Sequence, residues 1–184
     1  MSVQTRTQLQ ASAATITTET AAGANTAARV GGLFDDLADT ATLDRERGFA
    51  NLYIDTDTSF APTQGQRVKL TSTMKSGVLS TYNFTRTTNS ITYTGTTSAA
   101  LRIAASIVLS QNNNNQIKVY IAKNGTIIAQ SMADLTLSHD NGHAVYTEAY
   151  VTGAVNDEFT IYINAISSGS AITISALTFT VHTL

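Results

Sequence analysis

The sequence predicts a mainly β protein, an antiparallel two-sheet jelly-roll sandwich with a short N-terminal α-helix and an extended N-terminal arm. Three observations support the β-fold: two long runs of alternating apolar and polar residues, turns that contain Asn and Gly, and abundant threonine. The 184 residues include 31 Thr, a β-branched residue that suits the solvent-facing side of a sheet. The pattern begins at residue 49 and continues to residue 184, which defines the expected jelly-roll domain.

The strongest strand signals lie between residues 91 and 128. One strand carries Leu101, Ile103, Ala105, Ile107 and Leu109 on a single face, and the next carries Ile117, Val119 and Ile121 on a single face. Because side chains alternate between the faces of a strand, each strand has one face in a core. The polar run 111–116 separates them. Asn124-Gly125 favours a type I′ turn, which returns residues 127–128 onto residues 119–122. We therefore expect an antiparallel meander here.

Residues 1–24 are small, polar and rich in Thr and Ala. Alone, they would bury too little apolar surface to offset the entropy lost on ordering. Two interpretations remain open for this N-terminal arm. It is either a disordered tail or a segment that becomes ordered only against a partner.

Residues 25–48 show helical periodicity. Asn25 or Thr26 is a suitable N-cap, and Gly48 a suitable stop. The apolar stripe of this helix consists of Val30, Leu33, Phe34, Leu37 and Ala41, with acidic residues on the other side. A helix this short is marginal alone, so its stripe must dock on something. These five residues are our candidate oligomer or anchor contacts; packing on the chain's own β-domain is the other interpretation.

From residue 49 onward, the pattern indicates about ten short strands, as in a jelly roll. Residues 55–65 are expected to form a long loop. In the last strand, Ile172 and Ile174 are out of phase with the apolar residues that follow, Leu177, Phe179 and Val181. A one-residue slip near residues 175–176 therefore predicts a β-bulge.

Composition excludes several classes of function. A net charge of −2 gives no electrostatic reason for binding nucleic acid, and no apolar run is long enough to span a bilayer. The absence of Cys excludes disulfides, thiolate zinc sites and a cysteine nucleophile. The N-terminus lacks the apolar core of a secretion signal. We therefore expect a chain that is made and folded in a cytosol without a membrane stage.

The sequence gives little support for catalysis, and we predict no catalytic, cofactor or metal site. His139 and His143 flank an Asn-Gly pair, so we expect a surface loop rather than a metal-binding helix face. Asp55 and Asp57 are expected in a solvated turn rather than a calcium loop. No Ser lies in a Gly-x-Ser-x-Gly setting. The Asn run 112–115 is interpreted either as a simple loop or as side chains that stack near a symmetry axis.

Two parts of the chain resemble known families. The order of ITYTGTTSAALRIAASIVLS (91–110), QIKVYIAKNGTIIAQS (116–131) and AVYTEAYVTGAVNDEFTIYINAISSGSAITISALTFTV (144–181) resembles the trimeric jelly roll of tumour-necrosis-factor-like and complement-globular-head-like domains. The segment ITTETAAGANTAARVGGLFDDLADT (16–40) resembles one that recurs in bacteriophage fibre and adsorption proteins. The closest family in this resemblance is the head-fibre and tail-fibre proteins of tailed phages, including the crAss-like group, over roughly residues 15–184.

The resemblance implies a structural virion protein that is made in the host bacterial cytoplasm. It implies a homotrimer whose N-terminal segment binds the phage capsid or another fibre protein, with the jelly roll projecting outward. It supplies no catalytic motif, and it leaves open whether the protein is a head fibre, a tail fibre or a decoration subunit. The alternative is a receptor- or glycan-binding adhesin module at a fibre tip that contacts the host surface. An enzyme, such as a depolymerase, ranks third.

The charge pattern fits a shared interface. Residues 49–184 contain seven basic and seven acidic residues, which leaves large surfaces of Thr, Ser, Asn, Ala and Tyr. Subunit interfaces are depleted in charge and enriched in Tyr. Six tyrosines are candidates for positions between subunits, with ordinary core or surface positions as the alternative: Tyr82, Tyr93, Tyr120, Tyr146, Tyr150 and Tyr162.

Overall fold

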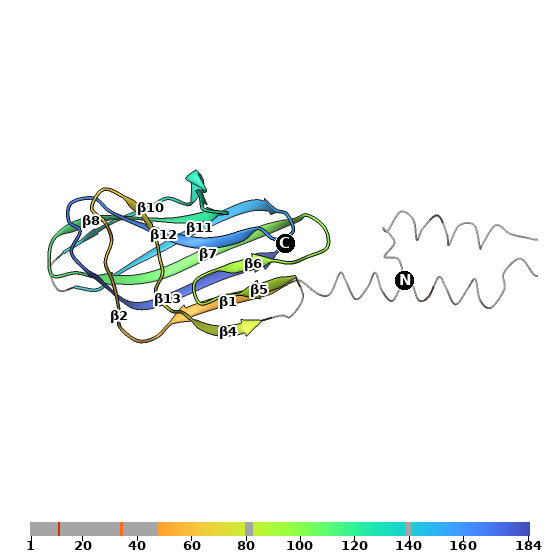
Figure 1. Cartoon of the computed structure of the whole chain (residues 1–184), viewed down its shortest axis with the longest axis horizontal. Helices are drawn as coiled ribbons and strands as arrows, with labels where there is room; N and C mark the ends of the chain where they lie inside the picture. Colours follow the sequence, from red (N-terminus) through yellow and green to blue (C-terminus); the bar gives the residue numbers. More distant parts are fainter. Residues whose placement is uncertain (1–10, 12–33, 35–47, 80–82, 139–140) are drawn as a thin grey trace, which may run out of the picture. The chain divides into compact units, whose positions relative to one another are not determined.

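The computed structural model describes residues 11, 34, 48–79, 83–138 and 141–184 (Figure 1). The chain divides into two units, Met1–Arg47 and Gly48–Leu184. The second unit is the β-domain, and all the strands named below belong to it. The expected arm (1–24) and helix (25–48) lie almost entirely outside the described residues and stay predictions.

Sheet A has six strands in which every pairing is antiparallel. Its order is β11 (His143–Gly153), β7 (Ala99–Ser110), β13 (Ile172–Thr183), β1 (Phe49–Ile54) and β4 (Lys75–Leu79). A short strand, β2 (Thr58–Phe60), also pairs with β13. The C-terminal strand therefore lies in the middle of the sheet.

Sheet B has seven antiparallel strands. Its order is β10 (Ala133–Leu137), β8 (Asn115–Lys123), β12 (Glu158–Ala165), β6 (Ile91–Tyr93) and β5 (Phe84–Arg86). In addition, β3 (Arg67–Lys69) pairs with β12, and β9 (Thr126–Ile127) pairs with β8. A 3-10 turn, η1 (Ala129–Ser131), links β9 to β10. Two antiparallel sheets built in this way confirm the predicted jelly-roll sandwich.

The core lies between the two sheets and follows the predicted alternation. In β7 the five residues from Leu101 to Leu109 that share a face are at most 1% exposed, and Ile117, Val119 and Ile121 of β8 are fully buried. The largest enclosed side chains are Phe84, Phe159 and Phe179. Full burial of such side chains contributes about 1.5–3 kcal/mol each, so the sandwich is held together mainly by this layer.

The expected meander is wrong at one point. β7 and β8 do not pair with each other; β7 belongs to sheet A and β8 to sheet B. Alternation determines which face of a strand is buried, and it does not determine the strand's partner. Successive strands are neighbours in only about two-thirds of cases. Here the polar loop that begins at Gln111 carries the chain from one sheet to the other.

Two other strands were not expected. Residues 55–65 were predicted to be one long loop, but Thr58–Phe60 within them form β2 and pair with β13. β4 (Lys75–Leu79) pairs with β1, and Gly77 lies so close to Asn51 that an added Cβ would collide with the Asn51 side chain. Both segments are short edge strands without clear alternation, so periodicity gave no signal for them.

The local turn predictions are confirmed. Asn124 and Gly125 both have positive φ angles, 51° and 76°, and Ala122 pairs with Ile127 across the turn. Ile128 N donates to Ile121 O at 2.9 Å. In β13 the register shifts between Ile174 and Ala176. The bulge lets the apolar residues on both sides of it point into the core.

The Asn run between β7 and β8 is more than a solvated loop. Gln111 and Asn115 are 3% and 2% exposed. Asn115 Nδ2 donates to Gln111 Oε1 and to Ser168 O, each at 2.9 Å, and its Oδ1 accepts from the backbone N–H groups of Ser167 and Ser168 at 2.9 and 3.2 Å. The Asn115 side chain therefore fixes the turn between β12 and β13, which places it inside the subunit rather than at a symmetry axis.

Replacing Asn115 with Ala should lower the free energy of unfolding by about 1–3 kcal/mol, because the substitution leaves the buried Gln111 Oε1 and the backbone N–H groups of Ser167 and Ser168 without these partners. Urea denaturation monitored by circular dichroism measures the change. Asn113→Ala is the matched control, since Asn113 is exposed and its contact with Ser170 is 3.4 Å long. Equal stability of the two variants would contradict the role given to Asn115.

Candidate functional site

The outer face of sheet A consists of side chains in cross-strand rows that run from β11 through β7 and β13 to β1. The rows follow from the register of the three strand pairs. From β11 to β1, the first row is Tyr150, Arg102, His182 and Phe49; the second is Glu148, Ala104, Thr180 and Asn51; the third is Tyr146, Ser106, Thr178 and Tyr53. We call these twelve residues the sheet A face.

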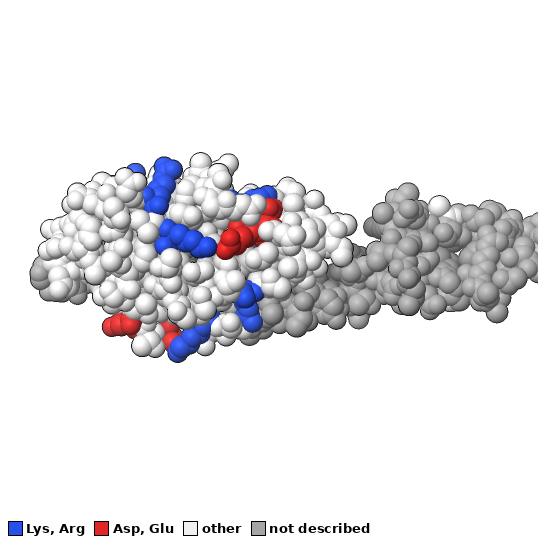
Figure 2. Space-filling view, in the orientation of Figure 1, with Lys and Arg blue, Asp and Glu red and all other residues white. Residues whose placement is uncertain are grey.

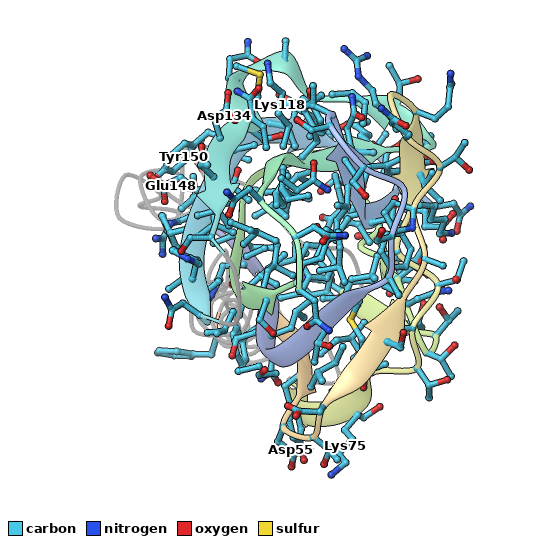
Figure 3. The ribbon with its side chains drawn as sticks, turned by 90° about the vertical axis from the view of Figure 1, so that its left-hand side faces the viewer. Asp55, Lys75, Lys118, Asp134, Glu148 and Tyr150 are labelled. Atoms are coloured by element: carbon cyan, nitrogen blue, oxygen red, sulfur yellow. The ribbon has the colours of Figure 1, made fainter. Side chains whose placement is uncertain are left out.

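The sheet A face has aromatic ends and a small, polar centre. Tyr146 and Tyr150 are 53% and 61% exposed, although they lie on a central part of β11 rather than in a loop. Glu148 and Tyr150 project from the same side of the domain (Figure 3). In the second and third rows the two central strands carry only Ala, Ser and Thr side chains, which allow another surface to approach closely, and in the first row they carry Arg102 and His182. Exposed tyrosines around small residues are typical of a surface that binds another macromolecule.

The two charges of the sheet A face neutralise each other. Arg102 donates to Glu148 Oε2 from Nε at 3.1 Å and from Nη2 at 2.9 Å. The Tyr146 hydroxyl donates to the same Oε2 at 2.7 Å and accepts from Arg102 Nη2 at 2.8 Å. The hydrogen bond from Tyr146, followed by those from Arg102, lowers the pKa of Glu148. The arginine and the carboxylate therefore enter any interface as a neutral, oriented group.

His182 lies beside this network. Its ring is 4.5 Å from the Phe49 ring, and its register partner on the other side is Arg102. Burial, and then the positive charge of Arg102, lower the pKa of His182 below its ordinary value of 6.5. The neutral imidazole is therefore the form that the fold favours.

The six candidate tyrosines fall into different environments. Tyr93 is 2% exposed, and its hydroxyl donates to Thr97 O at 2.8 Å, so it is a core residue. Tyr120 is 4% exposed and is likewise buried within the subunit. Tyr146 and Tyr150 are available on the sheet A face, and Tyr162 is half-buried on sheet B. Tyr82 lies outside the described residues.

The predicted anchor residues are not brought together by the described structure. Of the stripe, Phe34 is described; it is helical and 64% exposed. Val30, Leu33, Leu37 and Ala41 lie outside the described residues, so the stripe stays a prediction.

The other sequence candidates show ordinary surface contacts. Asp55 forms an ion pair with Lys75 at 2.5 Å (Figure 3), and the hydrogen bond from Lys75 contributes most to lowering its pKa. His143 Nε2 lies 2.9 Å from Ser138 Oγ, while His139 is outside the described residues. Among residues 48–79, 83–138 and 141–184, no three His, Asp or Glu side chains gather as metal ligands. No helix in the described part of the chain is long and apolar enough to cross a bilayer.

A second surface lies on the outer face of sheet B. Arg67 of β3 reaches across β12, and its guanidinium carbon is 5.1 Å from the centre of the Tyr120 ring. Tyr162 of β12 pairs with Tyr120 on one side and Lys69 on the other. Lys118 lies in the neighbouring row. Basic side chains appear over the region where β10 and β12 are labelled, within a mostly uncharged surface (Figures 1 and 2).

We call Arg67, Lys118, Tyr120, Tyr162 and Asn164 the tyrosine–arginine patch. It brings a cation, an aromatic ring and an amide together on three antiparallel strands, β3, β12 and β8. Sequence reasoning missed this patch, and it also missed the pairing of Arg102 with Glu148. In both cases the residues come from strands that are far apart in sequence, so no local spacing marked them.

A shallow pocket of about 370 Å³ lies at the hairpin between β8 and β9. It is lined by Lys123, Asn124, Thr126, Ile127 and Ile128. The Lys123 ammonium is already paired with Asp157 at 2.7 Å. The pocket therefore has an apolar floor and no available charged group in the described residues, and we assign it no chemistry.

Comparison with known proteins shows the fold and not a family. No protein-family model and no curated protein matches the sequence. A crystal structure of murine APRIL at pH 5.0 is similar to this chain with a TM-score of 0.52 and 10% sequence identity, over 75% of this chain and 99% of that chain. APRIL has a tumour-necrosis-factor-like jelly roll, so the finding supports this part of the resemblance. The similarity to APRIL gives no evidence about a role in phages.

The lowered pKa of His182 predicts a measurable pH dependence of the stability of the folded chain. Because the folded chain resists protonation of this imidazole, stability should be greatest above about pH 6.5 and fall as the pH decreases through that value. When the pH is lowered from about 7.5 to about 5.5, the melting temperature should decrease less in His182→Gln than in the unchanged protein.

The carboxylates with lowered pKa, such as Glu148, titrate in a more acidic range, so they do not account for this difference. A decrease of equal size in both proteins would show that His182 carries no part of the pH dependence.

Proposed function

We propose that this chain is a structural subunit of a bacteriophage particle, a head-fibre, tail-fibre or decoration protein. In this proposal, three copies associate through the sheet A face, and residues 1–47 attach the trimer to the capsid or to another fibre protein. The observation that carries the proposal is the sheet A face itself: exposed Tyr146 and Tyr150 on a surface whose charges, Arg102 and Glu148, are already paired.

This face favours self-association over an enzymatic role for a physical reason. Desolvating an unpaired charge is costly, but Glu148 accepts three hydrogen bonds, from Arg102 and Tyr146, within its own subunit. The remaining polar groups of the face are hydroxyls, the amide of Asn51 and the imidazole of His182. The tumour-necrosis-factor-like fold and the resemblance of residues 16–40 to phage fibre segments agree with this assignment. The same particle-bound role implies a location in the virion.

Tyr150→Asp should convert the trimer into monomers. The substitution removes an aromatic contact of the kind that contributes about 2 kcal/mol or more at an interface and adds an unpaired charge. Sedimentation equilibrium at micromolar concentration measures the oligomeric state, and circular dichroism checks that the monomer is folded. Met132→Asp is the control, because Met132 is 50% exposed but lies beside η1, outside the sheet A face.

An unchanged protein that sediments as a monomer at this concentration would overturn the proposed assembly. A trimer that tolerates Tyr150→Asp would assign the interface to another face.

Removal of residues 1–47 should leave a folded β-domain that no longer binds the particle, because the two units are distinct in the chain. Binding is measured by co-sedimentation with particles assembled without this subunit. The control is the full-length chain carrying Met132→Asp, which should bind. Binding by the truncated protein would contradict the anchor assigned to the N-terminal segment.

A second candidate function is favoured by the tyrosine–arginine patch. In this alternative, the projecting domain is an adhesin that binds a carbohydrate on the host surface. Aromatic rings stack on sugar rings, and arginine and amide groups form hydrogen bonds with hydroxyls or acidic groups. The patch and the sheet A face lie on different sheets, so both functions are compatible in one trimer. A glycan array without binding would contradict this second function.

A further inference from the structure

We propose that the tyrosine–arginine patch binds an acidic carbohydrate, in which the guanidinium of Arg67 pairs with the sugar carboxylate and Tyr162 stacks against the ring. The inference rests on the second candidate function and names its site and its ligand class.

The available charge on the patch belongs to Arg67. Lys118 lies 3.6 Å from Asp134, and Lys69 lies 3.2 Å from Glu158, so both lysines have carboxylate partners. Figure 3 shows Lys118 and Asp134 next to each other. In the described structure no carboxylate pairs with Arg67, whose partner is the ring of Tyr120. Its planar fork of N–H donors is therefore available to a carboxylate, which it matches with two parallel hydrogen bonds.

The aromatic part of the patch is already fixed in place. Tyr120 is 4% exposed, and the guanidinium carbon of Arg67 lies over its ring, 5.1 Å from the centre, in a cation–π contact that restrains the arginine side chain. Tyr162 is the register partner of Tyr120 and remains partly exposed. A sugar whose carboxylate binds Arg67 thus has the partly exposed ring of Tyr162 beside it. A ligand that meets a fixed surface loses less side-chain entropy on binding.

Two polar atoms on the same strand lack partners. Asn164 is 9% exposed and Thr160 is 2% exposed, and Asn164 Oδ1 and Thr160 Oγ1 have no hydrogen-bond partner among the described residues. They lie two positions to either side of Tyr162 on the outer face of β12. Asn164 is the register partner of both Arg67 and Lys118. A sugar hydroxyl that donates to Asn164 Oδ1 would satisfy this otherwise costly buried acceptor.

The charge balance favours a carboxylated sugar over a nucleic acid. A nucleic-acid surface needs several cations that follow the phosphates. Here Asp134 and Glu158 form ion pairs with the two lysines, and their negative charges would repel a phosphate backbone. One accessible guanidinium beside one partly exposed ring and one amide matches a single acidic sugar in a chain of mostly neutral groups.

The test uses the full-length protein and trigalacturonic acid as the probe, with neutral maltotriose as the comparison, in titration calorimetry and ligand-observed NMR. We expect the acidic trisaccharide to bind at least about tenfold more tightly than the neutral one. Arg67→Gln should weaken its binding by at least about tenfold, since it removes the charge-assisted hydrogen bonds to the sugar carboxylate. Tyr162→Ala should weaken the binding of both sugars.

Lys75→Gln is the matched control, because it removes one positive charge at the edge of sheet A, away from the patch. Equal loss of affinity in Arg67→Gln and Lys75→Gln, or equal affinity for inorganic phosphate and duplex DNA, would show general charge attraction and overturn the inference. No binding of trigalacturonic acid at millimolar concentration would also overturn it.

The oligomeric state of each variant separates this inference from the structural proposal. An Arg67→Gln trimer that no longer binds the acidic sugar supports the inference. If the unchanged protein is a trimer but binds neither sugar, the inference is overturned and the proposed structural role is not affected. If the unchanged protein is a monomer and binds the acidic sugar, the proposed trimer is contradicted and the inference about the patch is supported.

Discussion

The central constraint on this domain is the register of β13 between β7 and β1. The pairing with β7 extends from Thr173 to Thr183, and the pairing with β1 joins the first strand of the domain to the last. Because side chains alternate along each strand, this register decides which residues fill the core and which form the outer rows. A slip of one residue in β13 would turn His182 toward the core and Phe179 toward solvent. The sheet A face depends on this register, and the tyrosine–arginine patch depends on the register of β12 with β3 and β8.

The two outer faces are suited to different partners. On sheet A, the charged pair Arg102 and Glu148 is neutralised within the subunit, and aromatic side chains surround small ones, which suits a dry contact with another protein surface. On sheet B, Arg67 keeps a guanidinium that is held by a ring and lacks a carboxylate, which suits a small acidic ligand in water. The proposed role of a fibre subunit would use both properties, since one face would bind the other copies while the opposite sheet would face the surroundings.

The sequence predicted what depends on neighbours along the chain. The alternation in residues 101–109, the positive φ angles at Asn124 and Gly125, and the bulge before Leu177 are local properties, and all three are confirmed. The choice of sheet for β7 and β8 depends on contacts across the whole domain and was predicted wrongly. The contacts of Arg102 with Glu148 and of Arg67 with Tyr120 come from folding distant strands together, so no spacing revealed them.

The pairing of Phe49 with His182 has a consequence for the path of the backbone. Thr183 N donates to Gly48 O, and Leu184 N to Ala100 O, each at 3.0 Å. The polypeptide therefore enters and leaves the β-domain at one end, while the loop at residues 112–114 lies at the other. A short linker would connect residue 184 to residue 48, and opening that loop would yield a circular permutant. In such a molecule, a protein fused to the new termini would lie at the end of the domain opposite to residues 48 and 184.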